Sequence, residues 1–266
     1  MRQYFSHFKL QLLTGLQYRS AALAGLYTQF FWGFLYCMVY QAFYSHTSID
    51  SMSFKELISY VWLNQALFSL IIIRTKDSEI IDSIKNGTVA YELCRPYDLF
   101  SWWYLKLLAK RYANVALRFI PVIVLAFLLP SPYCLSLPYS IECFILFLIS
   151  LFLGTLIIVS INMMIHSISF FTMQEKGIAS IITTIGELLG GMYVPLPLLP
   201  LLILSITEYL PFRLVSDLPF RLYSNNINGM YALKSIILQF IWVILLFIIG
   251  KLVMKKALKK VCIQGG

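Results

Sequence analysis

The residues of this chain that could carry chemistry are few, and most of them lie in one polar stretch from Arg74 to Asp98. The stretch reads RTKDSEIIDSIKNGTVAYELCRPYD, and it mixes carboxylates with basic side chains between two long apolar runs. Charged groups are costly inside lipid, so such a segment needs a soluble partner or a membrane surface to lie against. We therefore interpret it as a contact between a membrane protein and a cytoplasmic protein.

The sequence patterns of common enzyme and metal sites are missing. Neither G-x-S-x-G with a histidine nor H-E-x-x-H occurs, and the three histidines, His7, His46 and His166, are scattered along the chain. The five cysteines show no C-x-x-C spacing and no histidine at ligand spacing, so no metal site is expected. Cys134 and Cys143 could form a disulfide, although two free thiols are the simpler interpretation. No G-x-x-x-x-G-K-[ST] phosphate loop is present, so the chain cannot be its own ATPase by that route.

The composition places the chain in a membrane. Hydrophobic residues make up 59% of it and charged residues 12%, against about 25% charged residues in soluble domains. The apolar residues come in blocks long enough to cross a bilayer, and in lipid such blocks must be helical because their backbone groups have no other hydrogen-bond partners. The net charge of +9 is placed in short loops between the blocks, as the positive-inside rule requires, so no nucleic-acid partner is expected.

The blocks predict an all-α polytopic membrane protein with six transmembrane helices in a single domain. Of the six predicted spans, the second span covers about 57–73, the third span about 112–129 and the fourth span about 140–165. Six spans place both termini on one side, and most Lys and Arg residues then lie on that side, which predicts cytoplasmic termini in the plasma membrane. The predicted segments are an interfacial helix (1–20), spans one and two (21–73), a polar insert (74–111), spans three to five (112–192), an outer re-entrant segment (193–229), span six (230–254) and a tail (255–266).

A short amphipathic helix is predicted inside the polar insert. Asp77 is a suitable N-cap, and acidic side chains near the start with Lys85 near the end suit the helix dipole. Asn86 and Gly87 would stop the helix, since Gly87 can adopt a positive φ, and Arg95-Pro96 breaks the chain again. A surface helix lying on lipid is the competing interpretation. The remaining members of the predicted helix are the acidic Glu79 and Asp82 and the apolar face of Ile80, Ile81 and Ile84.

The segment after the fifth span is apolar but broken. Pro195, Pro197 and Pro200 forbid a regular helix at its start, and the remainder is too short to cross a bilayer. We therefore predict a re-entrant or interfacial pair of short helices on the outer side.

Glu187 is predicted to lie near the outer third of the fifth span. There it could bind a cationic substrate, gate the outer exit, or simply pair with a neighbour such as Arg213. Gly186, Gly190 and Gly191 beside it permit close helix approach, which suits a dimer seam or a gate.

At two motifs the sequence resembles a known family. IKNGTVAYELCRPYD is similar to the I-x-x-G…L-x-R-P-x-[DN] signature of permease subunits of ATP-binding-cassette (ABC) exporters of the type-two class, and GGMYVPLPLLP…LPF resembles their segment after the fifth span. The shared layout covers the whole chain.

The resemblance implies a membrane subunit that is not itself an enzyme and that works as a homodimer or heterodimer, each half docking an ABC ATPase. ATP and Mg²⁺ would be bound by that partner, and this chain would need no cofactor. The cargo would be a hydrophobic or amphipathic drug, peptide or lipid-like molecule, exported from the cell. The family's coupling helix maps onto Asp77 to Lys85 and its turn onto Gly87 and Arg95-Pro96. Residues of a substrate path or outer gate would be Glu187, Gly190, Gly191, Pro195, Pro197 and Pro200.

Two other functions compete with transport by an ABC subunit. An intramembrane lipid-modifying enzyme would need paired catalytic groups in the membrane, and none is evident in the sequence. An ion-driven secondary carrier commonly shows internal repeats with broken mid-membrane helices, and the two halves of this chain show no convincing similarity.

Overall fold

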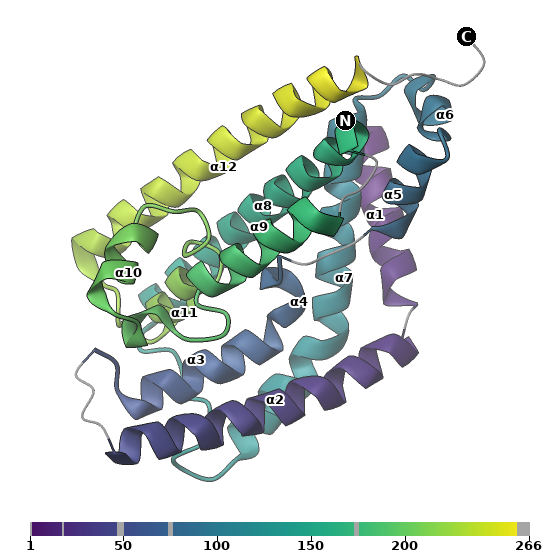
Figure 1. Ribbon diagram of the computed structural model, residues 1–266. Coiled ribbons are helices and arrows are strands. Elements are labelled where there is room, and N and C mark those ends of the chain that lie inside the picture. Colours follow the sequence, from purple (N-terminus) through teal and green to yellow (C-terminus); the bar gives the residue numbers. More distant parts are fainter. Residues whose placement is uncertain (1, 18, 47–50, 74–76, 173–175, 260–266) are drawn as a thin grey trace.

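The computed structural model describes residues 2–17, 19–46, 51–73, 77–172 and 176–259, and these ranges contain helices and loops but no strand (Figure 1). The predicted all-α class is thereby confirmed. The helices are α1 (Arg2–Leu16), α2 (Arg19–His46), α3 (Phe54–Ala66), α4 (Phe68–Ile71), α5 (Ser78–Lys85), α6 (Val89–Leu93), α7 (Leu99–Leu128), α8 (Ile141–Thr172), α9 (Lys176–Leu189), the 3-10 turn η1 (Leu196–Leu198), α10 (Leu201–Thr207), α11 (Asp217–Tyr223) and α12 (Gly229–Leu258).

Four helices in the described part of the chain are long and apolar enough to cross a membrane. They cover Ala22–His46, Leu99–Leu128, Ile141–Phe171 and Gly229–Leu258. The other two predicted spans correspond to α3 with α4 and to α9, which are shorter: α3 has 13 residues and α9 has 14. At 1.5 Å per residue these two helices are about 20 Å long, against about 30 Å of hydrocarbon in a bilayer.

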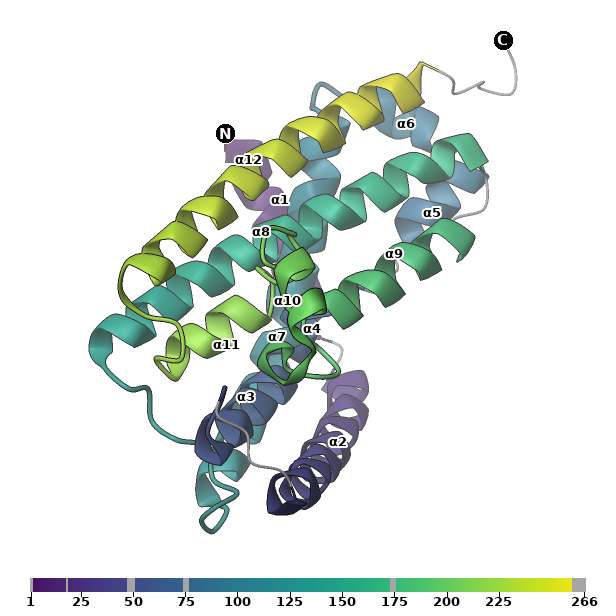
Figure 2. The same cartoon turned by 60° about the vertical axis from the view of Figure 1, so that its left-hand side comes forward.

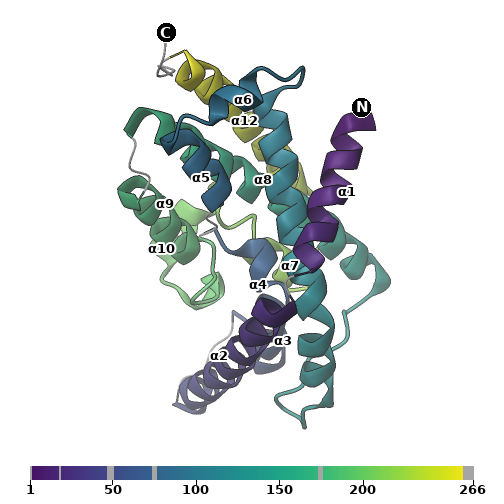
Figure 3. The same cartoon turned by 90° about the vertical axis from the view of Figure 1, so that its right-hand side faces the viewer.

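The insert helices α5 and α6 lie at the end of the bundle where α12 finishes, which we call the insert end (Figures 1 and 2). Helix α1 runs alongside α7 here (Figure 3). His7 stacks on Trp102 with ring centroids 3.6 Å apart, and the backbone N–H of Asp98 donates to the Tyr4 hydroxyl. Lys251 of α12 forms an ion pair with Asp98 at 3.2 Å. The first and last helices of the chain therefore meet the insert at one point.

The loops at the opposite end of the bundle, which we call the far end, are joined to one another. The Ser51 hydroxyl donates to the carbonyl of Pro197 at 2.9 Å, and the Asn226 side chain donates to the carbonyl of Ser51 at 3.1 Å. The Tyr223 hydroxyl donates to the carbonyl of Ser136 at 2.8 Å. Four loops that are distant in sequence thus converge there.

Two helices extend beyond the limits predicted from the sequence. The third span was expected from about Tyr112, but α7 begins at Leu99, where the Asp98 side chain caps it by accepting from the backbone N–H of Ser101. Helix α8 continues to Thr172, beyond the predicted limit of about 165, so His166 is a buried residue of the helix interior. In both cases polar residues interrupt the apolar pattern without interrupting the helix. In α7 tertiary contacts satisfy them, since Lys106 and Lys110 pair with Asp77 and Arg111 donates to backbone carbonyls.

The predicted second span is broken at Leu67, between α3 and α4. The backbone carbonyls that follow this break are satisfied by α7. The guanidinium of Arg111, which is buried, donates to the carbonyls of Ser69, Leu70 and Ile72 at 3.3, 3.0 and 2.8 Å. Carbonyls at a helix end lack partners within the helix, and Arg111 supplies them.

Polar and small residues also set the packing of α8. The two helices α8 and α12 run side by side (Figures 1 and 2). The amide of Gln239, inside α12, donates to the carbonyls of Ser150 and Leu214 at 2.6 and 2.8 Å. A Cβ on Gly154 would lie 3.0 Å from the carbonyl oxygen of Val215, so a glycine allows this close approach.

Cys134 and Cys143 are free thiols, not a disulfide.

Candidate functional site

The predicted amphipathic helix of the insert is present as α5. The Asp77 side chain accepts from the backbone N–H of Ile80 at 3.1 Å, which is N-cap geometry. Asn86 caps the other end, and Gly87 follows with φ +71°. The predictions of an N-cap at Asp77 and of a positive φ at Gly87 are confirmed.

Asp77 also holds α5 on α7 through two ion pairs. Its carboxylate lies 2.7 Å from the Lys110 ammonium and 3.4 Å from that of Lys106, with only 2% of the side chain exposed. Lys106 additionally pairs with Glu79. Burial acts to raise the pKa of Asp77, but the two ammonium groups and the N–H of Ile80 outweigh it, so that the pKa lies below its ordinary value. Asp77 is therefore ionised at neutral pH, and the start of α5 is held firmly on α7.

A second anchor holds α6. The indole N–H of Trp103, which is buried in α7, donates to the Glu92 carboxylate at 2.8 Å. Tyr97, in the loop between α6 and α7, stacks on Trp102 at 4.1 Å. The insert thus contacts α7 at both of its helices, and a force applied to the insert would be transmitted to α7.

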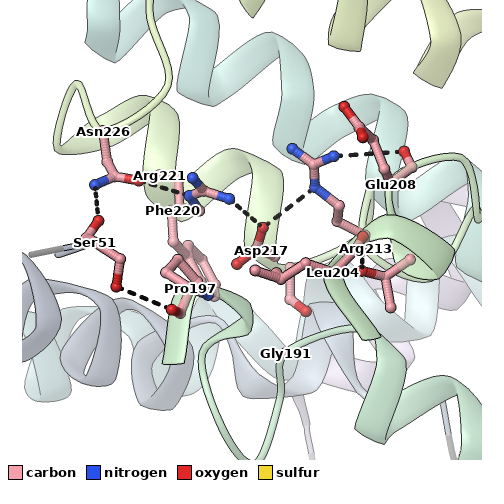
Figure 4. Close-up of polar contacts among 12 residues, drawn as sticks. Ser51, Gly191, Pro197, Leu204, Glu208, Arg213, Asp217, Phe220, Arg221 and Asn226 are labelled. Carbon is pink, nitrogen blue, oxygen red and sulfur yellow. Dashed lines mark hydrogen bonds and ion pairs between the residues drawn. The ribbon is translucent and has the colours of Figure 1, made fainter. Parts of the chain in front are cut away.

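A charged network joins the far end of the molecule (Figure 4). Asp217, at the start of α11, is fully buried between Arg213 and Arg221, whose nearest nitrogens lie 3.5 and 3.4 Å from its Oδ2. Arg221 donates to the side chain of Asn226 at 2.7 Å, and Asn226 in turn donates to the carbonyl of Ser51. The network therefore connects the start of α3 with the segments on both sides of α11.

The segment that follows α9 is held by α2 and α3. The Tyr60 hydroxyl donates to the carbonyl of Gly191 at 2.8 Å, and the side chain of Asn64 donates to that of Met192 at 3.2 Å. The Tyr40 hydroxyl donates to the carbonyl of Tyr193 at 3.1 Å. Gly191 has φ +76°, and a Cβ there would lie 2.7 Å from the Tyr60 hydroxyl oxygen. These hydrogen bonds connect three elements of the far end through backbone carbonyls.

Comparison with protein families assigns this architecture. The model of the family described as ABC-2 family transporter protein matches residues 26–265. The chain belongs to this ABC-2 transporter family. Membership makes it the permease component of an ABC transporter, a membrane transport component, and implies an ABC ATPase as partner. No curated protein matches the chain.

The structure divides the predicted coupling residues of the permease into buried and exposed groups. Ile80, Ile81 and Ile84 are 1%, 5% and 6% exposed, so protein and not lipid covers the apolar face of α5. Together with Asp77 they position the helix and are not available to a partner. The exposed members of the predicted set are Glu79, Asp82, Lys85, Gly87, Arg95 and Pro96.

The predicted outer residues of the permease extend from Glu187, which lies beside Ile71 and Ile73, to Pro197 at the far end. Glu187 is 6% exposed and accepts from the Tyr193 hydroxyl at 2.7 Å, while Arg213, its suggested partner, pairs with Asp217. The Ser216 hydroxyl donates to the carbonyl of Gly190. A Cβ on Gly190 would lie 3.1 Å from the carbonyl oxygen of Phe212, in the segment that leads into α11. Pro197 accepts from Ser51, as described above, and Pro195 and Pro200 lie at the N-caps of η1 and α10.

Sequence reasoning missed the centre of the far-end network in this permease. Asp217 was not among the candidates, although RLVSDLPFR places Arg213, Asp217 and Arg221 at successive intervals of four residues. Three charges at this spacing face one side of a helix, and in an apolar segment that pattern indicates a buried ion-pair network. Among the described residues, no group of three or more His, Cys, Asp or Glu residues is arranged to hold a metal.

Proposed function

We propose that this permease is the transmembrane subunit of an ATP-driven exporter, that it dimerises, and that α5 and α6 dock a separate ATPase subunit. The observation that carries the proposal is the firm attachment of an exposed charged surface to a long helix. Asp82 and Lys85 face outward on α5, and Tyr91 on α6 is 75% exposed. On their other side α5 and α6 are anchored to α7 through Asp77 and Glu92.

Six membrane crossings agree best with the path of the chain. The insert end and the far end alternate along the sequence, so α3 with α4 and α9 would cross together with the four longer helices. The insert end would face the cytoplasm of the plasma membrane, with both termini, because its basic residues suit the positive-inside rule. Helix α1 would lie at the inner interface, and η1 and α10 would form the outer re-entrant segment of one transmembrane domain.

Energy would pass from the partner to the spans by rigid-body motion. ATP binding would close the two ATPase subunits and displace α5, and the Asp77 ion pairs would carry the displacement into α7. The far-end network of Asp217 would act as the outer gate that this motion opens. Hydrophobic or amphipathic cargo, such as a drug, peptide or lipid-like molecule, would then leave the cell.

Replacing Gly87 by valine is expected to uncouple ATP hydrolysis from transport. The positive φ of Gly87 disfavours a β-branched residue, and a left-handed residue costs about 1–2 kcal/mol. No atom lies within 4 Å of the position of its Cβ, so the change alters the turn after α5 without a clash. We expect the complex with its ATPase, reconstituted in liposomes, to keep hydrolysing ATP while ATP-dependent efflux of a fluorescent amphiphile falls several-fold.

Gly229 offers a matched control for this experiment. It also has a positive φ, 55°, and open space around its Cβ position, but it lies at the far end, at the start of α12. The Gly229→Val variant should keep transport and hydrolysis coupled. Normal transport by the Gly87→Val complex would contradict the proposed role of the insert.

Helix α9 is the proposed dimer seam. No other described helix packs closely along it, and Ile181, Ile185 and Leu188 form an exposed apolar stripe, 62%, 47% and 48% exposed. We expect Ile185→Cys, in a chain whose native cysteines are replaced by serine, to form a disulfide-linked dimer in native membranes. Ile244→Cys, at an equally exposed position on α12, is the control and should stay monomeric. Equal crosslinking at both positions would exclude α9 as the seam.

A further inference from the structure

A partly open cavity of about 450 Å³ lies between α2, the α3–α4 pair and α7. Met192 and Tyr193, which follow α9, contribute to its lining. The cavity is formed within one copy of the chain and is separate from both the insert and the Asp217 network. Its volume suits a small amphiphile or the head and upper chain of a lipid.

One end of this cavity carries a positive charge. Arg118 of α7 lines the cavity and lies against Gly25 of α2. A Cβ on Gly25 would clash with the guanidinium of Arg118, so the glycine makes room for the charge. The described residues that line the cavity include no Asp or Glu. The net charge of the lining therefore favours an anion.

Gln29 adds a buried polar group whose hydrogen-bonding capacity is unused. It lies one helical turn beyond Gly25 on the same face of α2, lines the cavity and is 3% exposed. Neither its amide nitrogen nor its amide oxygen has a hydrogen-bond partner. A buried amide without partners costs free energy that a hydrogen-bonding ligand would recover. Asn64 and Gln65 of α3 supply further amides in the lining.

The remainder of the lining is aromatic. Trp32 and Tyr36 continue the stripe of Gly25 and Gln29 along α2, and Phe68 of α4 also lines the cavity. Residues 25 to 36 of a helix cover about 16 Å. Along α2 the lining therefore changes from the Gln29 amide, near the Arg118 guanidinium, to the rings of Trp32 and Tyr36, with Asn64 and Gln65 beside Tyr36. A matching ligand has an anionic head and a largely apolar body.

We propose that this cavity binds an anionic amphiphile, whose phosphate or carboxylate head pairs with Arg118 and Gln29 and whose apolar body lies along Trp32 and Phe68. A guanidinium binds either anion through paired hydrogen bonds. The site lies within a single copy of the chain, so it depends on neither the dimer seam nor the coupling proposed above. Binding can therefore be tested on the isolated permease, whatever the outcome of the transport experiments.

The test uses the full chain in phosphatidylcholine nanodiscs, titrated with dodecyl phosphate or with dodecylphosphocholine while tryptophan fluorescence is recorded. We expect dodecyl phosphate to bind about tenfold more tightly, which corresponds to roughly 1.4 kcal/mol. The Trp32→Phe variant should lose most of the signal. Arg118→Gln should remove the preference for the anion, Arg118→Lys should keep part of it, and Gln29→Leu should reduce affinity for both probes.

Controls and competitors complete the experiment. Lys234→Gln removes an exposed cation at the far end of α12 and should leave the preference unchanged. Competition by phosphatidylglycerol would identify a bilayer lipid as an occupant, whereas competition by dodecyl phosphate alone would restrict the site to single-chain ligands. Equal binding of the two probes by the wild-type chain would overturn the proposal. So would an Arg118→Gln variant that keeps the preference, or full competition by inorganic phosphate. If Arg118→Gln does not fold, the Gln29→Leu and Trp32→Phe titrations still test whether the probes bind in this cavity. Unchanged affinity in Gln29→Leu together with an unchanged signal in Trp32→Phe would overturn the proposal.

Discussion

Asp77→Asn is expected to lower the thermal stability of the permease by several degrees and to weaken transport by its complex. Asparagine is as good an N-cap as aspartate, so the variant keeps the cap of α5 and loses only the charge. Lys106 is buried and Lys110 half-buried. Lys110 would lose its closest carboxylate, and both lysines would keep only the exposed Glu79 as an acidic partner. Removing one partner of a buried pair costs about 3–5 kcal/mol, and the partial exposure of Lys110 places this case near the lower limit.

Three measurements separate the roles of the Asp77 side chain. Asp77→Ala should cost about 1 kcal/mol more than Asp77→Asn, because it also removes the cap. Asp82→Asn, on the exposed face of the same helix, should leave the melting temperature unchanged. Unfolding is followed in one detergent at a fixed scan rate. Equal melting temperatures for Asp77→Asn and Asp82→Asn would show that the ion pairs contribute nothing.

The pKa of Asp77 determines the pH dependence of this difference. Because the folded-state pKa is lowered, the stabilisation is fully present above the ordinary carboxyl pKa of about 4 and is lost as the pH falls through the lowered value. The gap in melting temperature between wild type and Asp77→Asn should therefore stay constant from about pH 5 to 8. It should shrink only below about pH 4.

Asp217→Asn is expected to have the second large effect. Asp217 is fully buried, and its carboxylate faces two arginines, Arg213 and Arg221. Without the carboxylate both guanidinium groups would be left in a buried site with their mutual repulsion uncompensated, at a cost of about 3–5 kcal/mol. The melting temperature should fall, and protease cleavage at the far end should accelerate, because the same network holds Asn226 and Ser51.

A second substitution tests whether charge is the cause. Arg213→Met, added to Asp217→Asn, removes one of the uncompensated cations and should recover part of the lost stability, since a buried ion pair can often be replaced by apolar residues at little cost. Glu142→Gln, at an exposed position near the start of α8, is the control and should behave like wild type. A double variant less stable than Asp217→Asn would refute the electrostatic explanation.

The insert helix was predictable because its determinants are local. The cap at Asp77, the isoleucines at helical spacing and the stop at Gly87 all lie within a dozen residues, and each acts through its own segment of backbone. What covers the isoleucine face was not predictable. The pattern shows that Ile80 and Ile84 need an apolar environment, and both a lipid surface and a protein core would provide it.

The boundaries of the spans were less predictable where polar residues lie inside helices. Lys106, Lys110 and Arg111 made the first third of α7 resemble a loop. Their partners, among them Asp77 and the carbonyls of α4, come from segments some 30 to 40 residues away. A hydropathy pattern contains no information about such partners, so it assigned these residues to the insert.

The segment after α9 shows most clearly which properties were predictable from the sequence and which were not. The prolines and glycines after α9 indicated a broken outer segment, and this much follows from backbone geometry alone. The bonds that hold the segment in place join residues such as Tyr60 and Gly191, which are 131 positions apart. Only the packing of α2, α3 and α11 against one another brings them within reach.

The sequence by itself determined that this protein is helical, that it belongs in a membrane, and where a capped amphipathic helix interrupts its apolar blocks. Those properties depend on composition and on periodicity within a few turns. The tertiary structure decided which charged residues are buried together, which face of α5 remains free for a partner, and that a cationic cavity lies beside α2. Each of these is a property of surfaces formed by distant segments, and it exists only once the helices have packed.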